Sequence, residues 1–158
     1  MIMNDHTNSI RSILAILCLS SITSCSDTTQ KPLTNVNLTL ISQADLNPDV
    51  NKRPSPVDIR IYQLRNSNAF MHAKFFDLYP DPQKDCSSDI IKEHIVEIGT
   101  NQTKSMDIEL DEKTQYLGFI IAYYDIEHAQ WRDIRQVSAI DAPLSLHLNA
   151  RDFLIQPS

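Results

Sequence analysis

Three oxygen-bearing side chains, those of Asp45, Asn47 and Asp49, stand at alternate positions, which is the spacing that opens an EF-hand calcium loop. The later positions do not continue the match. The sixth position is Val50, where a glycine is needed for the sharp turn, and the twelfth is Pro56, where a glutamate would bind calcium through both oxygens. The sequence therefore does not predict a calcium site in this segment.

The positions of the histidines and glycines argue against a zinc site, a phosphate-binding loop and a hydrolase motif. The five histidines are His6, His72, His94, His128 and His147. No two of them stand four apart and none lies in a Cys/His cluster, so a zinc site would need residues from distant segments. Glycine occurs only at positions 99 and 118, which leaves no phosphate-binding loop and no G-x-S-x-G motif. A Ser-His-Asp triad stays open because its members meet only in space. We predict that the protein is not an enzyme and holds no metal or cofactor.

Cys25 has the strongest chemical context of the three cysteines. An apolar run from Ile13 to Leu19 follows Arg11, and it is too short to span a bilayer, which takes about 20 residues. The run predicts a secretory signal peptide. The residues Ile22-Thr23-Ser24-Cys25 resemble a bacterial lipobox, which implies cleavage after residue 24 and lipid attachment to Cys25. The alternatives are an ordinary cleaved signal with an incidental Cys25, or an uncleaved anchor.

The lipobox interpretation also predicts a location. Ser26 follows Cys25 in place of the aspartate that commonly retains such lipoproteins in the inner membrane, so we expect the periplasmic face of the outer membrane. Several acyl chains, such as a palmitate on the amino group beside the diacylglyceryl group, hold a protein there stably. Residues 25–34 are polar and predict a lipidated tether reaching up to roughly 30 Å. Cys86 would be the one remaining thiol, which leaves no intramolecular disulfide, and we expect it to be inert.

Composition narrows the class of protein further. The 158 residues include 14 Lys and Arg against 20 Asp and Glu, a net charge of −6, and loss of residues 1–24 would not change it. An acidic chain without a dense cationic run lacks what nucleic-acid binding needs. With 42% hydrophobic and 22% charged residues, the chain is typical of a folded protein, and we predict one domain over residues 35–158.

Hydrophobic periodicity predicts a mostly β fold. Alternation of two predicts strands at Val36 to Leu40, at Val57 to Leu64 and at Met106 to Leu110. The continuous apolar run 116–124 predicts a central strand buried on both faces. With further strands at 95–98, 131–137 and 144–155, the count is about seven, which is typical of a β-sandwich.

Two short helices are predicted between the strands. In residues 66–79, Met71, Phe75 and Leu78 fall on one helical face, and prolines follow at 80 and 82. A second helix is expected from Ser87 or Ser88 to about residue 93, because serine is a good N-cap.

The connection 44–56 between the first two predicted strands is unusually long. It has thirteen residues, whereas hairpin loops usually take about 2 to 5. Three prolines, at 48, 54 and 56, stiffen it, and it carries charges of both signs. From these properties alone it is either a binding loop or a solvated insertion.

The order of these features resembles the TssJ (SciN) outer-membrane lipoproteins of type VI secretion systems. The resemblance covers the mature chain and is carried by the lipobox, Leu46-Asn47-Pro48-Asp49, Arg53-Pro54-Ser55-Pro56, the aromatic stretch 70–79, the run 117–125 and Trp131-Arg132. A departure is Gly99-Thr100-Asn101-Gln102, where the family often has a Pro-Gly-Glu-like turn. The resemblance implies a transthyretin-like antiparallel β-sandwich of about 7–8 strands with a small helical addition.

The resemblance also implies a partner. In that family the lipoprotein binds the periplasmic C-terminal domain of the inner-membrane subunit TssM and so tethers the machine to the outer membrane, and the loop between the first two strands contributes to the contact. Carried over to this chain, the predicted partner-binding residues are Asn47, Pro48, Asp49, Lys52, Arg53 and Pro54. Trp131 is expected to pack, and Arg132 to support a loop through polar contacts. The alternative is a periplasmic lipoprotein that binds a small molecule or glycan on its sandwich face, with exposed aromatics around a concave patch.

Overall fold

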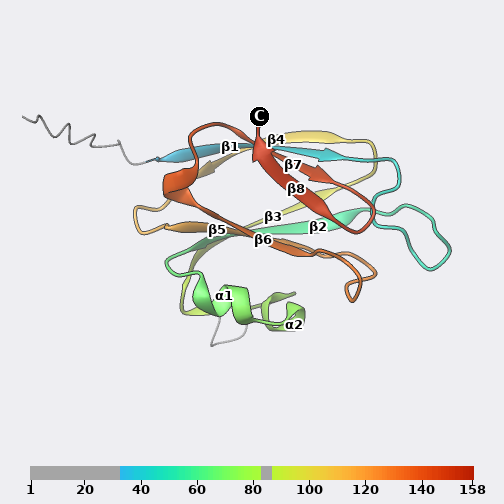
Figure 1. Ribbon diagram of the computed structural model, residues 1–158, viewed down its shortest axis with the longest axis horizontal. Helices are drawn as coiled ribbons and strands as arrows, with labels where there is room; N and C mark the ends of the chain where they lie inside the picture. The colour runs from blue at the N-terminus through green and yellow to red at the C-terminus, as the bar shows by residue number, and fades with distance from the viewer. Residues whose placement is uncertain (1–32, 83–86) are drawn as a thin grey trace, which may run out of the picture. The chain divides into compact units, whose positions relative to one another are not determined.

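The computed structural model describes residues 33–82 and 87–158, which fold as a sandwich of two four-stranded sheets (Figure 1). The order is β4-β1-β7-β8 in one sheet, here the β1 sheet, and β3-β2-β5-β6 in the other, the β2 sheet. The strands are β1 (Asn35–Ser42), β2 (Val57–Leu64), β3 (Ile90–Ile98), β4 (Thr103–Glu109), β5 (Tyr116–Ile121), β6 (Arg132–Gln136), β7 (Leu144–Leu148) and β8 (Phe153–Pro157). The predicted signal peptide, Cys25, most of the tether and Cys86 lie outside the described residues.

The predicted β-sandwich is confirmed, with eight strands. Every strand pairing is antiparallel except that of β1 with β7, which is parallel and matches Leu38 with Leu144. The inner faces of the two sheets form the main core. The predicted alternation of β1 holds, since Val36, Leu38 and Leu40 are all buried there. Successive side chains of a strand point to opposite faces of the sheet, so a strand with this pattern buries one face in the core and exposes the other to solvent.

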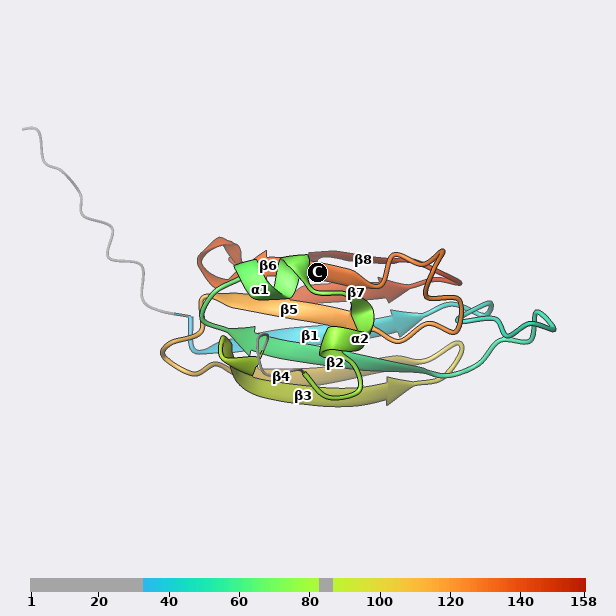
Figure 2. The ribbon, with the colours of Figure 1, turned by 90° about the horizontal axis from the view of Figure 1, so that it is seen from below.

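A small helical addition covers the outer face of the β2 sheet (Figure 2). It contains α1 (Asn68–His72) and α2 (Phe75–Leu78), separated by an extended backbone at Ala73 and Lys74. The prediction of one continuous helix is therefore wrong. Because the break turns the second helix, Phe75 and Leu78 are buried while Met71 is 40% exposed.

Gly118 of β5 lets α1 approach the sheet. A methyl group built on Gly118 would lie 2.7 Å from the ring of Phe70, so any larger residue would displace that ring. Phe70 in turn meets Tyr62 of β2 edge to face, with ring centroids 6.0 Å apart. This contact is the centre of a second, smaller core between the helices and the β2 sheet.

Three predicted boundaries need correction. No helix reaches residue 93, because β-branched residues from Ile90 onward pair with β2 as part of β3. The predicted strand 116–124 ends at Ile121, where the chain turns toward β6. The predicted strand 144–155 is two strands, because Asn149 N–H donates to Asp152 O (2.9 Å) and closes a hairpin.

The turn at 99–102, where the chain departs from the family pattern, is formed with a residue other than glycine. Asn101 takes a positive φ of 52°, a conformation that asparagine tolerates better than most residues. The Gln102 side chain accepts a hydrogen bond from Gly99 N–H (3.1 Å) and steadies the turn.

Candidate functional site

Four connections meet at one end of the sandwich, which we call the loop end. They are residues 43–56, 99–102, 122–131 and 149–152. Strand pairing places them together, since Val57 pairs with Ile98 and Ser42 with Leu148. The described chain begins at the opposite end, the Leu33 end, and β1 runs from there to the loop 43–56 (Figure 1).

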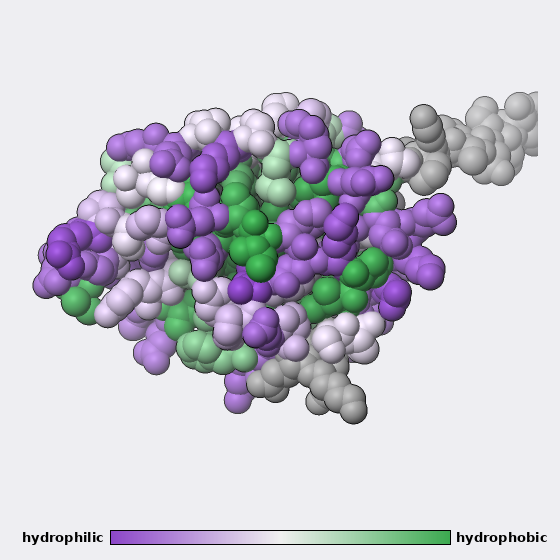
Figure 3. All heavy atoms as spheres, turned by 180° about the vertical axis from the view of Figure 1, so that it is seen from behind, coloured by the Kyte–Doolittle hydropathy of each residue, from purple (hydrophilic) through white to green (hydrophobic). Residues whose placement is uncertain are grey.

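The loop 43–56 projects furthest from the sheets. In Figure 3, which shows the molecule from behind, it forms the largely hydrophilic projection at the far left. Its base is tied to two neighbouring connections. The Ser42 hydroxyl donates to Gly99 O (2.6 Å), and Gln43 N–H donates to Leu148 O (3.0 Å).

Asn47 connects the loop to the connection between β5 and β6. Its side chain is buried, with the residue only 6% exposed, and it donates to Pro56 O (2.7 Å) while its Oδ1 accepts from Tyr124 N–H (2.6 Å). Its φ is 47°, again a conformation suited to asparagine. The neighbouring Leu46 is fully buried in the main core. Both side chains therefore hold the loop in place from inside.

Asp49 organises the turn at the tip. Its Oδ1 accepts from the backbone N–H groups of Asn51 (2.8 Å) and Arg53 (2.9 Å), and its Oδ2 pairs with the Arg53 guanidinium (2.6 Å). The hydrogen bonds from Arg53 lower the pKa of Asp49 below its ordinary value. The carboxylate is thus used within the loop.

The outward surface of the loop comes from its tip. Val50 is 75% exposed, Lys52 is exposed with a φ of 60°, and the Arg53 and Pro54 side chains also face solvent. The loop has 14 residues, and its tip presents one apolar side chain between hydrophilic neighbours.

The six predicted partner-binding residues therefore fall into two groups. Asn47 and Asp49 are engaged inside the loop, and Pro48 is half-buried beside them. The exposed members are Lys52, Arg53 and Pro54.

Two exposed residues of the loop end were missed by the sequence prediction. One is Val50, and the other is Tyr124, which was assigned to the buried strand but is 60% exposed. The signal that marks Tyr124 as a turn residue is the change to charged residues directly after it, at 125 and 127. Tyr123 before it is buried and donates to Asp152 O (2.6 Å), so the two neighbouring tyrosines face opposite ways.

A charged cluster links two further connections of the loop end. Asp125 accepts from His128 Nδ1 (2.7 Å) and pairs with Arg151 Nε (3.0 Å). The hydrogen bond with Asp125 raises the pKa of His128, and the same bond lowers the pKa of Asp125. Gln130 N–H also donates to Arg151 O (2.9 Å). With the bond from Tyr123 to Asp152 O, the connections 122–131 and 149–152 are thus joined by three contacts.

The two aromatic and cationic residues before and at the start of β6 have the structural roles expected of them. Trp131 packs edge to face on Phe75, with centroids 5.3 Å apart. Arg132 donates to the carbonyl oxygens of Phe70 (2.7 Å) and Ala73 (2.8 Å) and fixes the junction between α1 and α2. Both predictions are confirmed.

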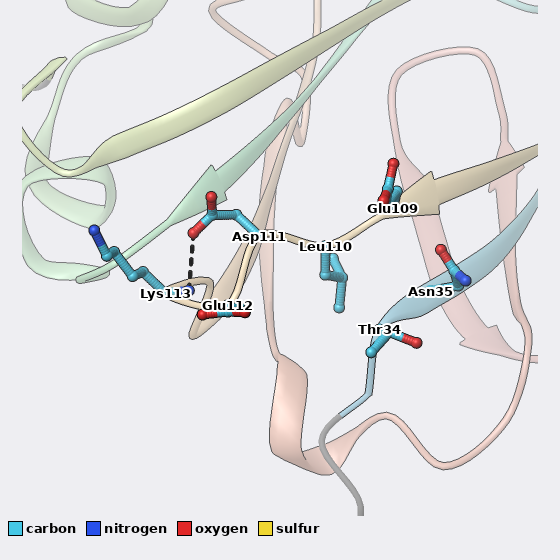
Figure 4. A pocket seen from close by; sticks show the side chains of 7 residues that line it. All are labelled: Thr34, Asn35, Glu109, Leu110, Asp111, Glu112 and Lys113. Atoms are coloured by element: carbon cyan, nitrogen blue, oxygen red, sulfur yellow. Dashed lines mark hydrogen bonds between the residues drawn. The ribbon is translucent and has the colours of Figure 1, made fainter.

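The Leu33 end carries a hollow of about 640 Å³ (Figure 4). It is lined by Thr34, Asn35, Glu109, Leu110, Asp111, Glu112 and Lys113. Asp111 accepts from Lys113 N–H (2.9 Å), and no aromatic side chain lines the hollow. It therefore lacks the exposed aromatics that the alternative prediction of a glycan or small-molecule site requires.

Residues 33–82 and 87–158 contain no group of three or more His, Cys, Asp or Glu side chains placed to hold a metal ion. Within the same ranges, no helix is long and apolar enough to span a membrane.

The sandwich, its helical addition and its projecting loop define a β-sandwich domain of the kind found in secretion-system lipoproteins. The family model described as Type VI secretion lipoprotein, VasD, EvfM, TssJ, VC_A0113 matches residues 34–152, and the chain belongs to this family. It is therefore a type VI secretion lipoprotein. Among curated proteins, none is a significant match to the chain.

Solved structures support the assignment. The crystal structure of the T6SS lipoprotein TssJ1 from Pseudomonas aeruginosa is 28% identical with a TM-score of 0.74, covering 80% of this chain and 99% of that one. Serratia marcescens Lip, a membrane-bound component of the type VI secretion system, shares the fold at 18% identity and a TM-score of 0.69, covering 79% and 97%. A chain in the structure of the T6SS protein TssM C-terminal domain from EAEC also shares the fold, at 20% identity and a TM-score of 0.69, covering 80% and 100%.

Proposed function

We propose that this lipoprotein is attached to the periplasmic face of the outer membrane through lipid on Cys25, and that its loop end binds the periplasmic C-terminal domain of a TssM-like inner-membrane subunit. The protein then links the secretion machine to the outer membrane. Its contribution is a contact between proteins and an anchor in lipid, and no bond is made or broken.

The observation that carries this proposal is the loop 43–56 at the end opposite Leu33. A chain attached near residue 25 enters the domain at one end, and β1 leads to the loop at the other. The tether thus joins the Leu33 end, and the loop end lies at the end of the domain away from that point of attachment.

The internal bonds of the loop favour binding. Asn47 and Asp49 fix the backbone on both sides of the exposed tip, so little conformational entropy remains to be lost when a partner docks. An exposed valine between a lysine and other polar groups offers one apolar contact within a hydrophilic rim, which is the usual arrangement of a protein interface.

Two fold neighbours support the choice of partner. One is a chain in a type VI membrane complex, and another occurs in the structure of a TssM C-terminal domain.

The test is affinity capture of the full-length lipoprotein from detergent-solubilised cell envelopes. We expect the TssM-like subunit to be recovered with it. Failure to recover that subunit, under conditions that keep the membrane complex intact, would contradict the proposed partner.

A variant of the loop tip locates the contact. Replacement of the whole loop would remove the buried Leu46 and Asn47, so the sharper variant combines Val50→Ser with Lys52→Glu and leaves the internal bonds in place. We expect recovery to fall at least about tenfold, as for central interface residues. The matched control is Lys113→Glu, the same charge change on an exposed residue of the Leu33 end, which should leave recovery unchanged.

A separate variant tests the anchor. Cys25→Ser should release the processed protein from the outer-membrane fraction on a sucrose density gradient. Tight membrane binding of the processed serine variant would show that lipid on Cys25 is not the anchor.

A further inference from the structure

Phe76 is an aromatic side chain that the fold holds in solvent. It lies in α2 and is 70% exposed, whereas Phe75 beside it is buried. A partner that covered this side chain would gain roughly 1.5–3 kcal/mol of burial energy.

The backbone around Phe76 is fixed from both sides. Before it, Lys74 N–H donates to the Asp77 carboxylate (2.8 Å) in a capping box. After it, Leu78 O accepts from the Tyr62 hydroxyl (3.0 Å). The segment bearing Phe76 is therefore a rigid part of the β2 sheet's outer surface.

Tyr79 adds a second attachment. Its hydroxyl donates to the Asp58 carboxylate (3.1 Å), and the Arg60 guanidinium lies over its ring, 4.8 Å from the centroid. Asp58 is the second residue of β2 and so lies near the loop end. Figures 1 and 2 both place α2 nearer that end than α1.

Ring contacts and a stretch of backbone join Phe76 to the loop 43–56. Phe76 meets Phe75 edge to face at 5.1 Å, and Phe75 meets Trp131 at 5.3 Å. Trp131 ends the connection 122–131, whose Tyr124 N–H is bonded to Asn47. The exposed side chains at positions 50, 124 and 76 thus lie on segments that are linked to one another by these contacts.

The loop tip alone is too small for a stable contact. A specific protein interface takes about 20–30 residues from each partner, with a few aromatic or arginine side chains supplying most of the affinity. The loop has 14 residues, some of them buried. The partner must therefore reach beyond it, and the adjoining surface offers exposed aromatics toward α2.

We propose that Phe76 is a second apolar anchor for the partner that binds the loop 43–56, and that it inserts into an apolar pocket on the periplasmic domain of the TssM-like subunit. This inference rests on the proposed function. It extends the interface from the loop end across Tyr124 to the helical addition, so the partner contacts two faces of the domain.

The test compares Phe76→Ala with Met71→Ala in the detergent-solubilised full-length lipoprotein. Both residues are exposed on the helical addition, and Met71 lies on α1, further from the loop end. Binding to the purified C-terminal domain of the TssM-like subunit is measured by biolayer interferometry. We expect Phe76→Ala to raise the Kd at least about tenfold, and Met71→Ala to change it less than about twofold. Thermal unfolding should be the same for both variants.

The outcomes separate this inference from the proposed function. If the loop-tip variant loses binding while Phe76→Ala binds as the wild type does, the second anchor is wrong and the proposed function stands. If the wild type does not bind the domain, both fail. A photo-crosslinking residue at position 76 should attach to the TssM-like subunit in cells. A crosslink to a second copy of the lipoprotein instead would overturn the proposal. The proposal would also be overturned if the Cys25→Ser protein bound phosphatidylethanolamine–phosphatidylglycerol vesicles and the added Phe76→Ala change removed that binding, because Phe76 would then contact lipid.

Discussion

At each end of the sandwich, one buried side-chain amide holds a connection by hydrogen bonds, but the two connections expose different kinds of side chain. At the loop end, Asn47 joins the loop 43–56 to Tyr124 N–H. At the Leu33 end, Gln63 of β2 is fully buried, accepts from Asp111 N–H (2.9 Å) and the Thr114 hydroxyl (2.8 Å), and donates to the carbonyl oxygen of residue 109 (2.8 Å).

The difference lies in what the amide holds. Gln63 closes a short connection against the sheet and leaves carboxylates and Lys113 around a hollow. Asn47 instead holds a long loop away from the sheet and keeps Val50 and Tyr124 in solvent. Buried backbone groups need hydrogen-bond partners at both ends of the sandwich. At the loop end, the connection held in this way exposes Val50 and Tyr124, whereas at the Leu33 end it exposes charged residues. A comparison of variants at the two ends therefore shows how much each buried amide contributes to the stability of its own end.

The largest expected effect is that of Gln63→Leu. The leucine would leave four groups without the Gln63 amide, namely Asp111 N–H, the Thr114 hydroxyl, the carbonyl oxygen of residue 109 and His94 Nε2. We expect a loss of roughly 3–5 kcal/mol in the free energy of unfolding. Urea denaturation measures it. Thr114→Val removes one of the four partners and should cost less, and equal losses for the two variants would contradict the assigned role of Gln63.

Asn47→Ala should have the next largest effect. It removes the bonds to Pro56 O and Tyr124 N–H and places alanine at a positive φ, for an expected loss of about 2–3 kcal/mol. Hydrogen exchange at the amide of Tyr124 should accelerate, while that at Asp111 should not. Asn47→Asp keeps the acceptor for Tyr124 N–H and should fall between alanine and wild type. Faster exchange at both ends would show that the ends are not independent.

Ser42→Ala should have a moderate effect. The hydroxyl donates to Gly99 O (2.6 Å) and accepts from Gln102 N–H (2.9 Å) at a buried position, so we expect a loss of about 1–2 kcal/mol. The matched control is Ser105→Ala, an exposed serine of β4, with an expected change within about 0.5 kcal/mol. The urea midpoints of the two variants measure the difference, and a control as destabilised as Ser42→Ala would refute it.

The smallest expected effects on stability come from two histidines whose pKa values are shifted in opposite directions. Burial, with the charge of Lys92, lowers the pKa of His94 below 6.5, whereas the hydrogen bond with Asp125 raises the pKa of His128 above it. His128 therefore stabilises the fold below pH 6.5, and this contribution is lost as the pH rises through its folded pKa. His94 acts oppositely, since stability is lost as the pH falls below 6.5 toward its folded pKa.

Proton NMR titration of the two imidazole rings measures this order directly. We expect His128 to titrate at a higher pH than His94, and Asp125→Asn to lower the pKa of His128 alone. A His128 that titrates at or below His94 would show that the bond with Asp125 is absent in solution.

Periodicity predicted most of the sandwich because its signal is local. Val36, Leu38 and Leu40 alternate, and their strand forms where predicted. The run beginning at Tyr116 predicted a central strand, which β5 is. The exposed position of Tyr124 followed from the end of pairing at Ile121, which depends on where β6 begins and is not encoded in hydrophobicity.

The helical addition and the loop were harder to predict because distant contacts decide them. The break before Lys74 is fixed by Arg132, more than fifty residues away, through the carbonyl oxygens of Phe70 and Ala73. Likewise, the resemblance predicted Asn47 as a partner-binding residue, and only its hydrogen bond with Tyr124 N–H turns it inward. A polar side chain in a loop has the same sequence signature whether it faces a partner or its own backbone.

The position of β1 has a mechanical consequence. This strand alone joins Leu33 to the loop 43–56, and it is an inner strand, paired along its length with β4 and over Leu38 to Ser42 with β7. A pull between an anchor at one end and a partner at the other would act along β1, nearly perpendicular to its antiparallel hydrogen bonds. Those bonds would share the load in shear instead of opening one after another. With the proposed anchor and partner in place, the strand that connects the two ends would also be the one that resists tension between them.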